Sequence, residues 1–169
     1  VLAYARVNRL NVVVHDSPSA RLGIVAAGKS YLDVRQALEH LGIDEQAAAR
    51  IGIRVLKLGL TWPLEPQGLH AFALGLEEIL VVEEKRPVIE DQVRAMLYHW
   101  PDARRPRVVG KRAEDAGPNE WLLPPTGELN AEQVALVIAS RLERFYADAR
   151  LDERVAWLRA KEEAASKPS

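Results

Sequence analysis

The chain has no cysteine among its 169 residues, and this absence removes several kinds of chemistry. Disulfides, thiolate metal sites, iron–sulfur ligation and thiol nucleophiles all require cysteine side chains. The histidines offer no replacement, because His15, His40, His70 and His99 lack the short spacings of metal-binding motifs. We therefore expect a cytoplasmic protein rather than a secreted one, and no metal site in this chain.

An excess of charge of one sign is also missing. The 23 Lys and Arg residues nearly balance the 24 Asp and Glu residues, and the formal net charge is -1. Such a chain generates no long-range field that would attract nucleic acid. Long apolar runs are absent too, since Ile79–Val82 ends at Glu83, far short of the ~20 residues that span a bilayer. We expect neither nucleic acid nor a membrane as a partner.

The chain does not start with methionine, and its first residues read as the end of a helix. Val1 is followed by apolar residues at helical spacing, without a capping residue before them. We expect a segment cut from a longer protein, in which residues 1–20 form a linker and the end of an upstream helix.

Short segments that are apolar on both alternate faces recur along the chain. They are Leu22–Ala27, Ile53–Leu58 and Ile79–Val82, and amphipathic helical patterns separate them. This pattern is typical of strands covered by helices on both sides. The alternation predicts an α/β fold with three layers, α/β/α, and a mostly parallel sheet over residues 21–148.

Caps predict where several helices begin and end. Ser30 is expected to cap the helix that follows the first strand, and Gly42 to end it. Asn130 with Gln133 has the spacing of a capping box, while residues 112–127 read as a long surface loop. Residues 149–169 alternate charges around few apolar residues, which predicts a charged tail helix that protrudes or frays.

The candidate functional residues lie just after the three predicted strands. In parallel sheets, ligands and partners approach the carboxyl ends of the strands, so these loops should share one edge. They combine an amide-rich turn, a large aromatic side chain and carboxylates, a mixture that is typical of an interface between domains. The candidate interface residues are Gly28, Lys29, Ser30, Thr61, Trp62, Glu83 and Glu84.

The catalytic interpretations of these loops are weaker. Gly28-Lys29-Ser30 is similar to a phosphate loop, but the earlier glycine, Gly23, falls inside the predicted strand, which favours a plain turn. Glu83 and Glu84 are neighbours whose side chains should point to opposite faces, so we expect one of them to be buried and bonded to Lys85, Arg86 or a backbone amide. Motifs for hydrolases and dinucleotide sites are missing. We predict no catalytic, cofactor-binding or metal-binding residue.

Three stretches carry a family resemblance: Leu22–Tyr31 with Val34, Lys57–Leu64, and Leu76–Lys85. Over residues 21–146 the chain resembles the middle of the large subunit of indolepyruvate ferredoxin oxidoreductases, which are 2-oxoacid:ferredoxin oxidoreductases. The resemblance implies a domain similar to the C-terminal domain of transketolase, packed beside thiamine-binding domains.

The resemblance also implies an activity for the parent enzyme. Such enzymes oxidatively decarboxylate arylpyruvates with coenzyme A to give an aryl-acetyl-CoA, carbon dioxide and reduced ferredoxin. They use thiamine diphosphate, Mg²⁺ and iron–sulfur clusters. This chain has neither a Gly-Asp-Gly thiamine motif nor cysteine clusters, so other parts of the parent would hold these cofactors.

The main hypothesis is a non-catalytic assembly domain whose partners are other domains or subunits of the oxidoreductase. The parent's own partners would be ferredoxin and coenzyme A. One alternative is an independent small-ligand or nucleotide-binding α/β module. Another is the equivalent domain of a transketolase or a 2-oxoacid dehydrogenase. The strand-end loops could face thiamine diphosphate, coenzyme A or only neighbouring domains.

Overall fold

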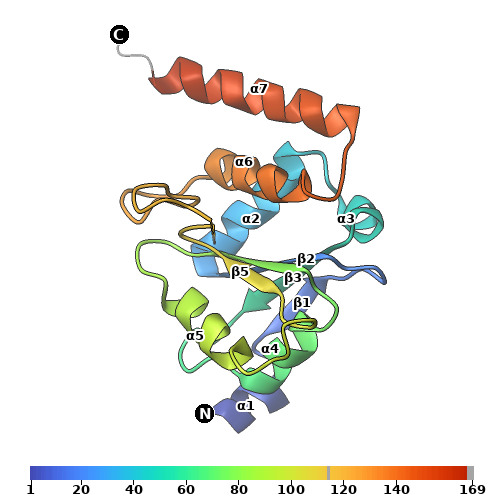
Figure 1. Ribbon diagram of the computed structural model, residues 1–169, viewed down its shortest axis with the longest axis vertical. Helices are drawn as coiled ribbons and strands as arrows, with labels where there is room; N and C mark the ends of the chain where they lie inside the picture. Colours follow the sequence, from blue (N-terminus) through green and yellow to red (C-terminus); the bar gives the residue numbers. More distant parts are fainter. Residues whose placement is uncertain (114, 167–169) are drawn as a thin grey trace.

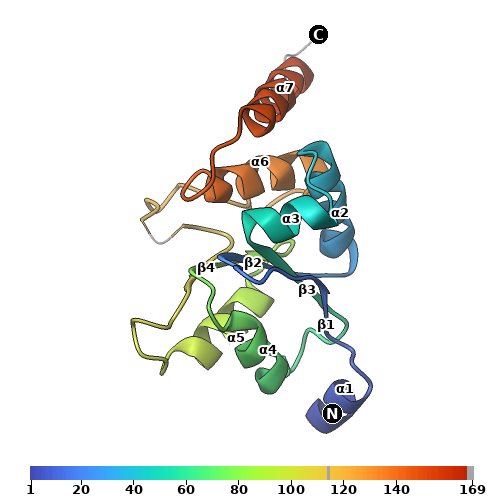
Figure 2. The same ribbon diagram turned by 90° about the vertical axis from the view of Figure 1, so that its right-hand side faces the viewer.

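The computed structural model describes residues 1–113 and 115–166. A central sheet lies between two layers of helices, with the first and last helices at opposite ends of the molecule (Figures 1 and 2). The elements are α1 (Leu2–Val7), β1 (Val12–His15), β2 (Leu22–Ala27), α2 (Gly28–His40), α3 (Glu45–Ile51), β3 (Ile53–Leu58), α4 (Pro66–Ala73), β4 (Glu78–Val82), α5 (Val88–Leu97), β5 (Arg107–Val109), α6 (Ala131–Leu142) and α7 (Ala149–Ser166).

The sheet has the strand order β1-β3-β2-β4-β5. Strands β3, β2, β4 and β5 run parallel, while β1 pairs antiparallel with β3 at one edge. In the centre of the sheet, Val25 lies opposite Leu56 on one side and Val81 on the other. The predicted α/β class and the mostly parallel sheet are confirmed. Strand β1 lies within residues 1–20, the stretch that the sequence assigns to a linker.

Both faces of the sheet are covered, as the two-sided apolar pattern predicts. Helices α2, α3 and α6 lie on one face, and α4 and α5 lie on the other (Figures 1 and 2). Alternate strand residues therefore enter two separate cores, with Ile24 and Leu80 on the first face and Val25 and Val81 on the second. Every residue of β4 is buried.

The start of α2 differs from the prediction that Ser30 caps it. The cap position belongs to Ala27, in extended backbone and without a capping side chain. Gly28 then begins the helix with a φ of 52°, a conformation that glycine adopts without steric cost. The helix thus follows the strand directly, and Ser30 is a buried residue in its first turn. The Ser30 cap was wrong, whereas Gly42, with a φ of 71°, ends the helix as predicted.

The last two helices pack on each other at one end of the molecule. The predicted capping box of Asn130 and Gln133 is present at the start of α6. Helix α7 lies outside α6 (Figure 1). An ion pair of 2.8 Å between Lys161 of α7 and Glu132 of α6 connects the two helices. Its apolar residues Leu151, Val155 and Leu158 are buried.

The predicted surface loop at residues 112–127 has no helix or strand in its described part, as expected. Glu114 of that loop and residues 167–169 of the predicted tail helix lie outside the described residues. Among the helices that the structure describes, none is both long enough and apolar enough to cross a membrane.

Gly23 has a packing role, consistent with its assignment to a strand rather than to a phosphate loop. A Cβ atom at this position would lie 2.8 Å from Cζ of Phe72 and closer still to Leu76, and both of these side chains are buried. We expect Gly23→Ala to lower the free energy of unfolding by about 1–3 kcal/mol, the usual range for overpacking a core.

Denaturant unfolding of the 169-residue chain measures this effect. Gly117→Ala is the matched control, because a Cβ atom there would meet its nearest neighbour at an ordinary 3.5 Å. The interpretation fails if the two variants have the same stability.

Candidate functional site

The segments that carry the candidate residues, namely the first turn of α2 and the loops after β3 and β4, do meet at one edge of the sheet. Ala27, at the end of β2, lies opposite Leu58, at the end of β3. On the other side, Ala26 lies opposite Val82, the last residue of β4. Because the three strands are parallel and in register, the loops that follow them leave the sheet side by side.

Lys29 links the first turn of α2 to the loop that follows β4. Its Nζ atom lies 3.0 Å from a carboxylate oxygen of Asp33 and 3.2 Å from one of Glu84. It also donates a hydrogen bond of 2.8 Å to the carbonyl oxygen of Leu129. The hydrogen bond to Asp33 is the main cause that raises the pKa of Lys29 above its usual value. Because acceptors of its own chain take up its N–H donors, Lys29 has little left to offer a bound anion.

Glu83 is buried beneath this edge, and its carboxylate accepts two backbone hydrogen bonds. One comes from the N–H of Ile89 and the other from the N–H of Glu90, each at 2.9 Å, in the first turn of α5. Burial raises the pKa of Glu83, and the two hydrogen bonds oppose that shift. The prediction that one of the two glutamates is buried and bonded to a backbone amide is confirmed. Glu84, the more exposed of the two, pairs with Lys29.

A buried lysine completes this part of the edge. Lys111 follows β5 and is only 5% exposed. Its Nζ atom donates to the carbonyl oxygen of Glu83, and its backbone N–H donates to Glu90 over 2.9 Å. Burial lowers the pKa of Lys111, while the nearby glutamates oppose this. We refer to Glu83, Glu90 and Lys111 as the buried polar cluster.

The sequence analysis missed Glu90 and Lys111. Lys111 had a recognisable signal, because it follows the short strand at 107–109 and so lies at the carboxyl end of a fourth parallel strand. Glu90 had none, since it reads as an ordinary acidic residue in the first turn of a helix, where such residues are common.

Trp62 is the most prominent exposed side chain on these loops, with 67% of its surface accessible. The loop beneath it is fixed to α5, because Gln92 donates a hydrogen bond of 2.9 Å to the carbonyl oxygen of Thr61. The side-chain oxygen of Gln92 also accepts a hydrogen bond of 2.8 Å from the N–H of Leu64. A large aromatic side chain on a braced loop is well suited to bind a protein partner.

The candidate residues thus fall into two groups. Ser30 and Glu83 are buried in their own domain, where they can support a partner surface without touching a partner. The exposed or partly exposed members are Gly28, Lys29, Thr61, Trp62 and Glu84. Lys29 and Glu84 are in direct contact. Thr61 and Trp62 lie at the same edge, where a hydrogen bond from Gln92 of α5 holds their loop.

The resemblance implies cofactors in the parent enzyme, but this chain does not supply the side chains that would bind them. The chain contains no cysteine to hold an iron–sulfur cluster. Across residues 1–113 and 115–166, no three side chains of His, Cys, Asp or Glu are grouped as a metal site requires. We therefore assign no step of a reaction to a cofactor on this chain.

The mostly parallel sheet and its two helical layers define an α/β domain, and this fold is shared by a 2-oxoacid:ferredoxin oxidoreductase and a transketolase. A 2-oxoglutarate:ferredoxin oxidoreductase from Magnetococcus marinus has this fold, with a TM-score of 0.53 and 15% identity over 82% of this chain and 21% of that chain. A split-gene transketolase is also similar, with a TM-score of 0.51 and 19% identity over 79% of this chain and 41% of that one.

The sequence identifies the family within that class. Residues 12–165 match the profile of the indolepyruvate oxidoreductase domain, and the chain belongs to this family. The resemblance stated from the sequence is thereby confirmed.

Two curated relatives illustrate the extent of the match. Indolepyruvate oxidoreductase subunit IorA of Pyrococcus abyssi is 42% identical over 79 residues, 47% of this chain and 11% of that protein. The same subunit of Methanothermobacter marburgensis is 42% identical over 93 residues, 54% of this chain and 14% of that protein. The match therefore spans only a small part of the length of these relatives.

Proposed function

We propose that this chain is a non-catalytic assembly domain of an indolepyruvate:ferredoxin oxidoreductase. The observation that carries this proposal is the carboxyl edge of the sheet, where the charged groups bond to their own chain while Trp62 remains exposed. The parent enzyme would oxidatively decarboxylate arylpyruvates with coenzyme A to aryl-acetyl-CoA, carbon dioxide and reduced ferredoxin. Thiamine diphosphate, Mg²⁺ and the iron–sulfur clusters would be held by its other parts.

The electrostatics of this edge support docking rather than catalysis. A general acid or base needs a proton that it can exchange with a substrate within hydrogen-bond reach. Glu83 instead receives two backbone N–H groups, and Lys111 donates to a carbonyl oxygen of its own chain. These bonds fix the ends of β4, β5 and α5, so they supply a rigid base for an interface around Trp62.

The alternative functions are weaker. A nucleotide-binding module would use Gly28-Lys29-Ser30 to hold phosphate, but Lys29 is occupied by Asp33 and Glu84. The equivalent domain of a transketolase or a 2-oxoacid dehydrogenase would share the fold. The match over residues 12–165 favours the indolepyruvate branch over both.

The proposal extends to domain organisation and setting. Residues 21–148 would form the transketolase-like domain, residues 1–20 a linker from which Val12–His15 adds an edge strand to the sheet, and residues 149–169 a charged tail helix. Its partners would be the other domains or subunits of a cytoplasmic enzyme, with ferredoxin and coenzyme A as partners of the whole.

We expect the 169-residue chain to be inactive by itself. Purified chain supplied with indolepyruvate, thiamine diphosphate, Mg²⁺, coenzyme A and a viologen electron acceptor should reduce no acceptor above the protein-free rate. The reason is that it has no ligands for the redox centres that pass electrons onward.

The positive control is the complete oxidoreductase, assayed in the same mixture and expected to reduce the viologen. Turnover that co-purifies with the 169-residue chain through two independent chromatographic steps would contradict the assembly role.

A further inference from the structure

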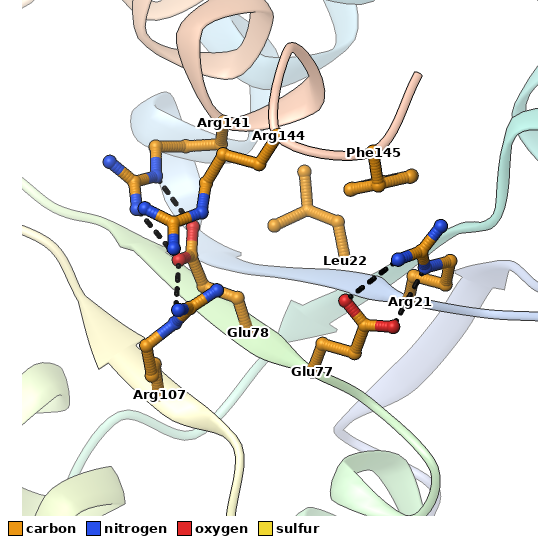
Figure 3. A pocket seen from close by; sticks show the side chains of 8 residues that line it. All are labelled: Arg21, Leu22, Glu77, Glu78, Arg107, Arg141, Arg144 and Phe145. Carbon is orange, nitrogen blue, oxygen red and sulfur yellow. Dashed lines mark hydrogen bonds and ion pairs between the residues drawn. The ribbon is translucent and has the colours of Figure 1, made fainter.

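A cavity of about 330 Å³ opens at the edge of the sheet opposite the candidate interface. It lies where three strands begin, because Leu22, Glu78 and Arg107 are the first residues of β2, β4 and β5 and lie opposite one another. Arg141, near the end of α6, and Arg144, just after it, reach over these strand ends (Figure 3). The sequence analysis did not identify this site.

Glu78 orders the floor of the cavity. It is buried, with 4% of its surface exposed, and its two carboxylate oxygens accept hydrogen bonds of 2.6 and 2.7 Å from Arg141. Such a bidentate pair fixes the plane of the guanidinium group and balances its charge. Among the described residues, Arg107 and Arg144 are the cavity arginines that no such bidentate pair holds.

Arg107 and Arg144 supply positive charge beyond this pair. The Nε atom of Arg107 is 3.4 Å from the Glu78 carboxylate, but it is buried and has no hydrogen-bond partner among the described residues. A buried donor without a partner is costly, which marks this atom for an acceptor from outside the chain. Arg144 forms no hydrogen bond or ion pair within residues 1–113 and 115–166, and its guanidinium group points toward Glu78 in Figure 3.

The remaining charges near the cavity do not cancel this surplus. Arg21 is paired with Glu77 by two hydrogen bonds of 2.8 and 3.1 Å, which is a neutral arrangement. Asp115 lines an adjoining recess together with Arg107, Arg141 and Arg144. Among residues 1–113 and 115–166, three arginines stand against two carboxylates, Glu78 and Asp115, which leaves one net positive charge from the described side chains.

We propose that this cavity binds the phosphate group of a small phosphate ester. The two guanidinium groups of Arg107 and Arg144 provide forked donors that match the terminal oxygens of a phosphate, with Arg141 held beside them by Glu78. The cavity is larger than one phosphate, and its other end is lined by Leu22, Phe145 and the neutral Arg21–Glu77 pair. That end suits a small apolar or planar group attached to the phosphate.

This site is independent of the proposed assembly role. It uses the amino ends of the strands, while the interface around Trp62 uses the carboxyl ends. A domain of the oxidoreductase could have either feature without the other, so each proposal can fail by itself.

Phenyl phosphate and inorganic phosphate are the probes for the test, added to the 169-residue chain at constant ionic strength. Binding is followed by calorimetry and by the ¹H–¹⁵N signal of the Arg107 Nε–H group, which should shift as phosphate fills that donor. We expect phenyl phosphate to bind more tightly than inorganic phosphate, because its ring adds apolar contact with Leu22 and Phe145. Arg144→Gln and Arg107→Gln should each weaken binding about tenfold, the usual effect of losing a charged hydrogen bond.

Arg159→Gln is the matched control, since it removes the same charge from an exposed position on α7 and should bind like the unaltered chain. Arg144 is exposed, so its substitution leaves the fold intact even if Arg107→Gln does not. The proposal is overturned if neither phosphate binds, if all variants bind equally, or if acetate and succinate bind as tightly as the phosphates.

Discussion

Replacing Lys111 by methionine should lower the free energy of unfolding by about 2–3 kcal/mol, because a buried carbonyl oxygen loses its charged hydrogen-bond donor. The lysine is 5% exposed and lies among Glu83 and Glu90, which are 7% and 5% exposed. Without it, the carbonyl oxygen of Glu83 loses its donor and the Glu83 carboxylate loses a nearby positive charge, whereas Glu90 keeps its ion pair with Arg94. Denaturant unfolding followed by circular dichroism measures the loss.

A double variant makes this prediction specific. If Lys111→Met acts by leaving buried negative charge without its cation, then Glu83→Gln in the same chain should recover part of the loss. Lys85→Met is the control, because Lys85 is exposed and its replacement should change stability by no more than ~0.5 kcal/mol. A Lys111→Met variant within ~1 kcal/mol of the unaltered chain would show that the buried polar cluster is not a stabilising unit.

Trp62→Ala should separate folding from assembly. The indole group is 67% exposed, so the stability of the 169-residue chain should change by less than ~1 kcal/mol. In the complete oxidoreductase, the same substitution should lower activity about tenfold or more, because a tryptophan at the centre of an interface typically contributes ~2 kcal/mol or more. Thermal melts of the chain and steady-state assays of the parent give the two readouts.

Trp157→Ala is the matched control for this experiment. Trp157 is 57% exposed but lies on α7, away from the strand-end loops. Equal activities for the two parent variants would contradict the proposed interface, and so would a Trp62→Ala chain that unfolds. Trp62 is a cleaner probe than Glu84, since reversing the charge of Glu84 would also disturb its ion pair with Lys29.

The two edges of the sheet differ in how their charges are arranged. At the carboxyl edge, Lys29, Glu83 and Lys111 are bonded to groups of their own chain. At the amino edge, one carboxylate, Glu78, orders Arg141 while Arg107 retains a buried donor without a partner in the described chain. The first arrangement stabilises a surface, and the second leaves hydrogen-bonding capacity for a ligand. This contrast is the basis for proposing assembly at one edge and anion binding at the other.

Local patterns in the sequence were enough to predict most of the fold. A strand that is apolar on both faces needs cover on both sides, so Leu22–Ala27 and its neighbours indicated three layers before any contact was known. Capping residues located the start of α6 at Asn130 and the end of α2 at Gly42 because their interactions span only a few residues. The predicted cap at Ser30 was wrong because Gly28 begins the helix with a positive φ, and the sequence pattern does not reveal that backbone conformation.

The sequence by itself determined the family, the strands and the meeting of three loops at one edge, since parallel strands place their carboxyl ends together. Only the tertiary structure decided which charged groups touch. Lys29 meets Glu84 across 55 positions of the chain, and Arg141 meets Glu78 across 63. Such pairs depend on strand register and on how helices cross the sheet, and neither leaves a periodic signal near the residues involved. The buried polar cluster and the cavity lined by Arg107, Arg141 and Arg144 could therefore be recognised only from the tertiary structure.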